Sequence, residues 1–583
     1  MDIAGAPFHY SDVPEWGAML SNVRTYARSY PWKAIYPAGA FFIAIMGFNL
    51  LGEGIRRLIE RVGVEVTRVF ANRYTFIAAT LAVAGFFWLR GSTGDIAFYQ
   101  RQARYFNGEQ ALGHVAVLSN PAINGRALGS AGLDIAADYI AKEFQKLGIQ
   151  PAGEKTTYFQ TRSRDYQELN SIPVFEVDDG KPAPVYHQDF VEYANSYFRN
   201  LGEGEGELHF ITTGNLLRTA RGFSSPRPPR ALEELDFTDE ILLVLSEEAA
   251  NDVRLVPKAG LLIVTDDQQK LQRRSTLSSR DPFSRVFGTN RVTGNDIPAM
   301  WISEEMANRL LDGSGYQVQE LRYLTEGLKQ DEVFDFSISK NLYMELDGSL
   351  REKVEARHVI GYLPGSAAVP GEAQLDNKMI VVLAQYDSPP LLPDGQIPVA
   401  ANDNAAGVAV MLEAIRTMKD SGYQPYKTFL FVAYSGEGLE GGEYVRAEVA
   451  KFLSAKLGFS SAYTIDTIVD LRGLGTKDGD QLLLSVSGSL RLANLFESAA
   501  RRMGNSIDRA GERVDISIVF EDGTNFNAGG EEAPRIGLLW EGWDKTSGTT
   551  MDTYENISAA HLEEGGETLS LALMILGRET TQQ

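Results

Sequence analysis

The chain contains the run MIVVLAQYDS (Met379–Ser388), in which an unbroken apolar stretch ends in polar side chains. A helical pattern, AAGVAVMLEAIRTM (Ala405–Met418), and a second buried-type run, KTFLFVAYSG (Lys427–Gly436), follow it. The alternation continues with TIDTIVDL, QLLLSVSG and RIGLLWEG. Short apolar runs that alternate with helices are typical of an α/β fold, in which helices cover both faces of a largely parallel sheet.

Polar side chains follow the ends of these apolar runs. In α/β sheets ligands bind beyond the carboxyl ends of the strands, so a site is expected there. The acidic and amide side chains in question are Gln385, Asp387, Asp403, Glu437, Asp470, Glu541 and Asp544. Carboxylates that share a cleft repel one another and need a cation, a basic ligand or raised pKa values. Ordinary capping and solvated loop acids are the alternative.

Length and composition exclude several classes of protein. A chain of 583 residues is long enough for several folded units, and 44% hydrophobic with 23% charged residues is an average globular composition. The net charge of -22 argues against nucleic acid as a partner, because a polyanion requires clustered basic surface. Cysteine is absent, which removes disulfides, thiolate zinc sites and cysteine nucleophiles.

Two uncharged runs near the N-terminus predict membrane helices, at about residues 34–52 and 74–90. A helix rises about 1.5 Å per residue, so the first run approaches the roughly 30 Å thickness of a bilayer core. The second run is shorter, but Arg73 and Arg90 can snorkel at its ends. A buried core helix is the alternative for each. The segment 53–73 between them holds five arginines, which the positive-inside rule places in the cytoplasm. We therefore expect a cell-membrane protein with an extracytoplasmic, acidic body.

The segment from Pro14 to Glu60 contains the run FNLLGEGIR (Phe48–Arg56). It resembles the carboxy-terminal end of permease subunits of dipeptide and oligopeptide ABC importers. The resemblance implies partnership with such permease subunits, and most of a permease is missing from this chain. Small residues at Gly39, Ala40, Ala44, Gly47 and Gly52 favour close packing with other membrane helices. A simple two-helix anchor is the alternative.

The soluble body shows further local patterns. Apolar residues at helical spacing from Gly132 to Ile149 predict an amphipathic helix that stops at Gly148. Residues 161–347 alternate short β-like runs with turn clusters, as in EILLVLS and AGLLIVTDD.

A series of motifs follows in order from about residue 114 to residue 575. They are NGRALGSAGLDIAADYIAKEFQKLGIQPAG, HVIGYLPGS, MIVVLAQYDS, VAANDNAAGVAVMLEAIR, TFLFVAYSGEG, TIVDLRGLG, EDGTNFNAGG and MDTYENIS. The series resembles the M28 family of zinc aminopeptidases. The resemblance implies an M28-like mixed sheet flanked by helices, with a protease-associated-like insert. The expected domains are a membrane anchor at 1–91, the first part of the M28-like domain at 92–160, the β-rich insert at 161–347 and the main part at 348–583.

In that family two zinc ions are held by two histidines, a bridging aspartate, a glutamate and a second aspartate. By the resemblance, the aspartates are Asp403 and Asp470, and Gln385 stands at the first histidine's position. Of two neighbouring glutamates only Glu437 is kept, beside Gly438, and it takes the role of general base or of ligand. Gly548 stands at the last histidine's position, and Gly523 at that of a further family histidine. We expect no rescue by a nearby histidine, because His358 precedes the first core strand of the sheet and His561 begins the C-terminal helix.

Zinc prefers imidazole or thiolate donors, and none is expected at these positions. We therefore expect no cofactor, or Ca²⁺ or Mg²⁺ on the oxygens of Gln385, Asp403 and Asp470. The resemblance also implies a cis peptide bond between Asp403 and Asn404.

Three functions remain open. The first is a catalytically inactive, membrane-anchored peptidase-like protein that binds peptides or assembles with a peptide importer. The second is an active metalloaminopeptidase with unusual oxygen ligands, in which Glu437 is catalytic. The third is a purely structural scaffold of an extracytoplasmic complex. Zinc content with an aminopeptidase assay separates the second from the others, and peptide binding separates the first from the third.

Overall fold

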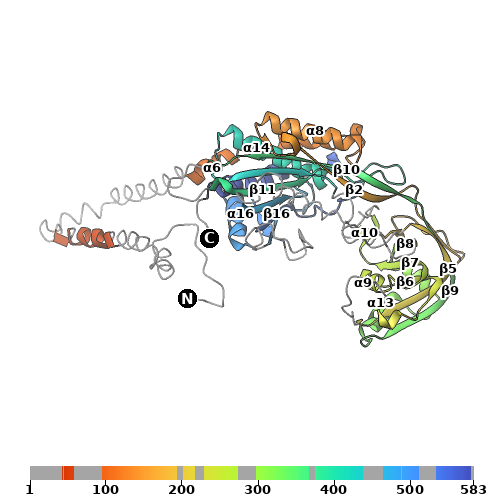
Figure 1. Cartoon of the computed structure of the whole chain (residues 1–583). Helices are drawn as coiled ribbons and strands as arrows, with labels where there is room; N and C mark the ends of the chain where they lie inside the picture. The colour runs from red at the N-terminus through yellow and green to blue at the C-terminus, as the bar shows by residue number, and fades with distance from the viewer. Residues whose placement is uncertain are drawn as a thin grey trace. The chain divides into compact units, whose positions relative to one another are not determined.

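The computed structural model describes most of the body and a short N-terminal stretch (Figure 1). The described residues are 42–43, 45–54, 56–57, 95–193, 201–216, 229–272, 297–366, 375–436, 464–487, 489–510 and 534–579. The chain divides into two compact units, Met1–Phe98 and Tyr99–Gln583.

The described residues between 42 and 57 are helical, and their large apolar side chains are exposed, among them Phe48 and Leu50. Within the described parts of the chain, no helix is both long and apolar enough to cross a bilayer. The predicted span 74–90 lies outside the described residues, and the span 34–52 lies partly outside them. Both membrane helices therefore stay predictions.

The main sheet of the second unit contains nine strands within the described residues, in the order β1-β10-β12-β11-β13-β16-β14-β15, with β2 paired to β10. Its central strands β12, β11, β13 and β16 are parallel, as the apolar runs predicted. The strands are β1 Gln150–Pro151, β2 Phe159–Leu169, β10 Gly348–Leu363, β11 Lys378–Gln385, β12 Thr428–Tyr434, β13 Thr464–Leu471, β14 Leu482–Ser487, β15 Ile507–Arg509 and β16 Arg535–Trp540.

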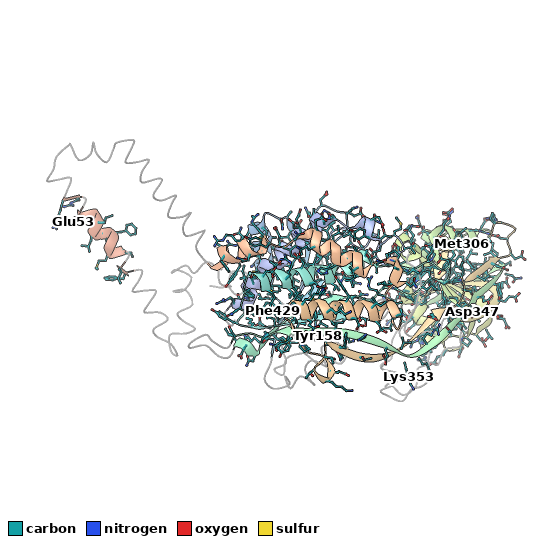
Figure 2. The ribbon with its side chains drawn as sticks, turned by 90° about the horizontal axis from the view of Figure 1, so that it is seen from above. Glu53, Tyr158, Met306, Asp347, Lys353 and Phe429 are labelled. Carbon is teal, nitrogen blue, oxygen red and sulfur yellow. The ribbon has the colours of Figure 1, made fainter. Side chains whose placement is uncertain are left out.

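Within the described residues the helices pack on one face of this sheet, whereas the pattern predicted helices on both faces. They enclose the largest apolar core, in which Phe429 of β12 is fully buried (Figure 2). Helix α14 packs on β11 and against α7 and α17. The helices of this part are α6 Asp95–Ala103, α7 Gly108–Leu118, α8 Ala131–Lys146, α14 Gly407–Asp420, α16 Leu490–Met503 and α17 Ala559–Arg578. A second, smaller core lies on the other face of the sheet, around Val381, Leu383 and Tyr434.

Helix α8 is the amphipathic helix that the spacing predicted. Its N-cap Ser130 accepts a hydrogen bond from the Leu133 N–H, and its buried face includes Ile140 and Phe144. Gly148, just beyond its end, has a φ of +68°, which favours glycine.

A second sheet lies between β2 and β10 in the sequence and has seven strands within the described residues, in the order β3-β9-β5-β6-β7-β8-β4. Its strands are β3 Val174–Val177, β4 Phe190–Glu192, β5 Gly202–Thr213, β6 Phe237–Val244, β7 Lys258–Thr265, β8 Ala299–Ser303 and β9 Val333–Leu346. Its helices are α9 Glu247–Asp252, α10 Gln268–Gln272, α12 Glu304–Leu311 and α13 Val318–Glu326. Residues 159–169 pair with β10 in the main sheet, so the second sheet itself runs from 174 to 346.

Candidate functional site

The carboxyl ends of β11, β12 and β13 meet at one edge of the main sheet, because these strands are parallel neighbours. Gln385 is the last residue of β11, and Asp470 is the last but one of β13. Both side chains are buried, with 5% and 2% exposure. The six-residue turn η5 (Ala401–Ala406), which leads into α14, contributes Asp403. The structure thus brings the three candidate metal ligands to the same edge.

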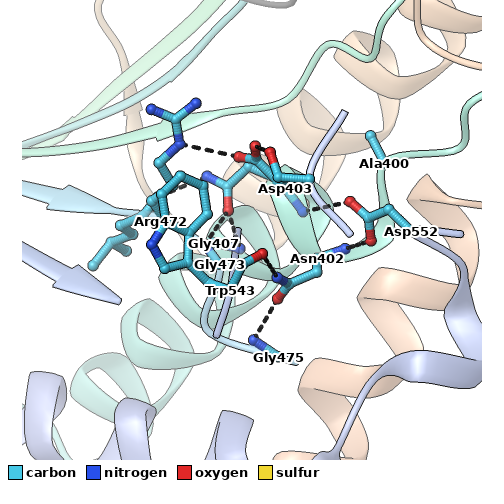
Figure 3. A network of polar contacts seen from close by, with 12 residues as sticks. Ala400, Asn402, Asp403, Gly407, Arg472, Gly473, Gly475, Trp543 and Asp552 are labelled. Carbon is cyan, nitrogen blue, oxygen red and sulfur yellow. Dashed lines mark hydrogen bonds and ion pairs between the residues drawn. The ribbon is translucent and has the colours of Figure 1, made fainter. Parts of the chain in front are cut away.

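Asp403 is held by two side chains from distant parts of the chain (Figure 3). Arg472 donates from Nε to Oδ1 at 3.1 Å, and Ser547 donates from Oγ to Oδ2. The Arg472 guanidinium also lies over the Trp543 ring, 4.8 Å from its centroid. Each carboxylate oxygen of Asp403 therefore already accepts a hydrogen bond, and its charge is matched by a guanidinium.

Asp552 supports the turn that carries Asp403. Its two oxygens accept the backbone N–H groups of Asn402, at 2.6 Å, and of Asp403, at 2.9 Å. Burial, together with the nearby Asp403 charge, raises the pKa of the Asp552 carboxyl to about 7. The two backbone hydrogen bonds act in the opposite direction and lower this pKa. Asp552 thus positions the backbone at Asp403.

Asn404 fastens the other side of the turn. Its Nδ2 donates to the Leu471 carbonyl at 2.6 Å, and its Oδ1 accepts the N–H groups of Gly407 and Gly473. The peptide bond between Asp403 and Asn404 is cis. This confirms the prediction made from the resemblance.

Arg126 is fully buried beneath the site and donates to backbone carbonyls of three separate segments. Its Nε donates to Tyr386, its Nη1 to Leu118 and Val399, and its Nη2 to Ala400. Burial lowers the pKa of Arg126 to about 10, and the charges of Asp387 and Asp552 oppose that shift. The guanidinium therefore joins the end of α7, the end of β11 and the start of η5.

His358 lies much nearer to the site than the sequence indicated. It is fully buried on β10, and its Nδ1 accepts the N–H of Ser435 at 3.2 Å. His358 precedes the first core strand in the sequence, but β10 runs antiparallel to β12 and places His358 beside the end of that strand. The next residue, Gly436, donates its N–H to Asp387 at 2.9 Å.

Other candidates lie elsewhere. Glu541 is exposed and accepts the Asp480 N–H, and His561 contacts the Thr476 carbonyl and stacks on Trp540, so neither belongs to this network. Glu437, Gly438 and Gly523 lie outside the described residues. Gly548 is described and directly follows Ser547, the residue that binds Asp403.

Among the residues that the structure describes, the donors around Asp403 do not fit a dinuclear zinc centre. A bridging aspartate must give one oxygen to each metal ion, and both oxygens of Asp403 accept protein hydrogen bonds. Gln385 and Gly548 supply no imidazole where the resemblance requires one. Within the described stretches, no group of three or more histidine, cysteine, aspartate or glutamate side chains is arranged to hold a metal ion.

The chain is similar to known proteins in two regions. Residues 365–573 match the model of peptidase family M28. An aminopeptidase from Aneurinibacillus sp. strain AM-1 superimposes with a TM-score of 0.56 at 16% sequence identity, over 84% of this chain and 98% of that one. The chain has an M28-like fold. The M28-like domain has the strand ends and the cis peptide that the resemblance implied.

The N-terminal part is similar to peptide permeases. The dipeptide transport system permease protein DppC of Alkalihalophilus pseudofirmus is 38% identical over 48 residues, which are 8% of this chain and 16% of that protein. The probable D,D-dipeptide transport system permease protein DdpC of Escherichia coli is 44% identical over 46 residues, 8% of this chain and 15% of that protein. The chain thus spans only about a sixth of these relatives.

Sequence reasoning missed Arg472, Ser547 and Asp552 as site residues. Two of the three stand inside quoted motifs, Arg472 in TIVDLRGLG and Asp552 in MDTYENIS. A basic residue directly beyond a strand whose last but one residue is an aspartate was an available signal.

Proposed function

We propose that this chain is a membrane-anchored, extracytoplasmic peptidase-like protein without hydrolytic activity, which binds peptides or assembles with a peptide ABC importer. The observation that carries the inactivity is the engagement of Asp403 by Arg472 and Ser547. In a metallopeptidase the metal lowers the pKa of bound water and polarises the scissile carbonyl. Glu437 alone, without a metal, has no activated water to use.

Membrane anchoring and partnership rest on the N-terminal part. Two uncharged runs, at 34–52 and 74–90, support two membrane helices, with 53–73 cytoplasmic and the M28-like domain outside. The similarity to dipeptide permeases supports docking against permease subunits of such an importer. The second sheet, which runs from 174 to 346, supports a protease-associated-like insert over most of the predicted residues 161–347.

The cation preference follows from the donor set. Gln385, Asp403 and Asp470 offer only oxygen, so any ion that enters is Ca²⁺ or Mg²⁺ and zinc is substoichiometric. Arg472 competes with such an ion for Asp403.

The test combines metal analysis with an aminopeptidase assay on the full chain in mild detergent. We expect well under one zinc ion per chain, no hydrolysis of amino-acid anilides with or without added zinc, and no change in melting temperature on chelation. About two zinc ions per chain, with activity lost on chelation, would establish the active metalloaminopeptidase instead.

Partnership is tested separately by purification of the tagged chain in mild detergent followed by mass spectrometry. Recovery of permease subunits of a peptide importer is expected. Recovery of the chain alone at monomer mass contradicts docking and leaves a simple two-helix anchor.

A further inference from the structure

The second sheet and the main sheet are built on separate apolar cores. Phe159 at the start of β2 and Val354 in β10 pack against the core of the main sheet. Leu169 at the end of β2 and Leu346 at the end of β9 belong to the core of the second sheet. Among the described residues, none is shared between the cores of the two sheets. The strands β2 and β10 therefore connect two bodies that fold around different cores (Figure 1).

We propose that the second sheet and its helices turn as one rigid body about the ribbon formed by β2 and β10, and that a latch of hydrogen bonds at Asn170 sets their resting orientation. Bodies with separate cores and a narrow connection move relative to each other by hinge rotation. The residues that absorb such a rotation lie at the ends of the connecting strands. This motion requires neither peptide binding nor membrane anchoring.

The ribbon between the two bodies is only two strands wide. β10 pairs with β12 and β1 only from Val359 onward, so within the described residues the earlier part of β10 has β2 as its one neighbour. Four residue pairs, from Gly348 to Arg351, lie between the second sheet and a bulge in β10. A two-stranded ribbon without a third strand is marginally stable in water. The connection is therefore the weakest part of either sheet.

The bulge lies on the side of the main sheet. Between Arg351 and Val354 two residues of β10 stand opposite one residue of β2, and Lys353 has a φ of +56°. Such an extra residue interrupts the ladder and bends the strand that carries it. Val354, directly beyond the bulge, is fixed to the main body, because a Cβ added at Gly129 would lie 2.2 Å from it. The rotation is thus confined to the residues between the bulge and the second sheet.

The latch, formed by Asn170, Asp347 and Ser349, closes the other end of the ribbon. The Asn170 N–H donates to the Asp347 carbonyl at 2.9 Å, and Nδ2 donates to Asp347 Oδ1 at 3.1 Å. Asn170 Oδ1 accepts the Ser349 hydroxyl at 3.1 Å. Asp347 joins β9 to β10, so one amide side chain ties the two strands where the chain passes between the sheets.

The exposure of the latch makes it easy to open. Asn170 and Asp347 are both exposed, so water competes for their hydrogen bonds and replaces them when they break. The resting orientation is therefore held by a few weak bonds rather than by a buried interface, and a ligand or partner that favours another orientation shifts the population toward it.

The test measures distances between spin labels by pulsed electron paramagnetic resonance on the full chain in mild detergent. The chain contains no cysteine, so introduced cysteines alone take the label. The spanning pair is Ile135→Cys on α8 with Tyr323→Cys on α13. One internal pair joins Ile135→Cys to Leu490→Cys on α16, and the other joins Tyr323→Cys to Glu248→Cys on α9. All four native side chains are exposed.

In the parent we expect a broader distance distribution for the spanning pair than for either internal pair. Asn170→Ala removes both side-chain hydrogen bonds of the latch and should broaden the spanning pair about two-fold, with the internal pairs unchanged. The matched control is Asn120→Ala, which removes another exposed asparagine whose Oδ1 accepts a backbone N–H, in the short helix η1 (Pro121–Ile123) of the main body. It should change none of the three distributions.

Three results would contradict the proposal. Equal widths for all three pairs, in the parent and in Asn170→Ala, overturn the hinge. A spanning pair that is broad in the parent but unaffected by Asn170→Ala overturns the latch. Internal pairs as broad as the spanning pair show that the two bodies themselves deform, which contradicts rigid rotation.

Discussion

Arg126 illustrates how much of the site depends on a single side chain. Replacement by methionine would leave the carbonyls of Leu118, Tyr386, Val399 and Ala400 without this donor, and it would remove a positive charge that interacts with the charge of Asp387. We expect Arg126→Met to lower the free energy of unfolding by about 3–5 kcal/mol, as for other broken buried charge networks. Urea denaturation measures this, with Arg501→Met as a control within about 0.5 kcal/mol of the parent. A loss below about 1 kcal/mol would show that water replaces the guanidinium.

Lys258, in the second sheet, makes stability depend on pH. Burial lowers its pKa to about 7, although Nζ donates to the carbonyls of Val253 and Val256. Between about pH 7 and 10 the unfolded chain binds more protons at this lysine than the folded chain does, so stability rises with pH. The free energy of unfolding of the parent, measured relative to that of Lys258→Met, should therefore rise by about 2 kcal/mol from pH 7 to pH 9. A constant difference in urea denaturation at both pH values would contradict the low pKa.

At the scale of elements, α17 packs closely against the segment before α7. A Cβ at Gly566 would lie 2.0 Å from the Phe106 ring, whereas one at Gly565 would meet nothing nearer than Leu474, at 3.5 Å. Gly566→Ala should therefore destabilise the protein by about 1–3 kcal/mol through overpacking. Gly565→Ala should be neutral or stabilise it by up to about 1 kcal/mol, since alanine favours helix. Thermal denaturation of the two variants measures the difference. Equal melting temperatures would mean that the Phe106 ring moves aside without a loss of stability.

At the scale of the whole molecule, the two compact units should separate. The core of the M28-like domain begins with Tyr99 and Ala103 of α6, so a chain that starts at residue 92 keeps every described core residue. We expect this shortened chain to stay in solution without detergent and to melt within about 2 °C of the full chain. Size-exclusion chromatography and circular dichroism check this. Aggregation, or a loss of 10 °C, would show that residues 1–91 are part of the folded body.

The elements were predictable because their signals are local. The apolar runs of β11, β12 and β13 and the spacing of α8 depend only on neighbouring residues. The identity of the groups around Asp403 was not predictable in this way. Arg472 lies 69 residues away from Asp403 in the sequence, and Ser547 lies 144 residues away. The resemblance implied metal ligands only, and it carried no expectation for other side chains that approach the Asp403 carboxylate.

The position of His358 in the fold was likewise not predictable from local sequence patterns. It precedes the first parallel strand in the sequence, and only the antiparallel register of β10 with β12 places it beside Ser435, 77 residues later. Register depends on the cooperative pairing of whole strands, and a sequence pattern does not fix which residues face each other.

Binary pattern and motif order were enough to predict an α/β sheet and the edge that carries the candidate site, because each depends on residues that lie close together in the chain. Only the folded structure decides that the Asp403 charge is met by a guanidinium and a hydroxyl from distant segments. The physical reason is that a buried carboxylate must find its partners in space, and those partners are chosen by strand register and loop packing across the whole domain.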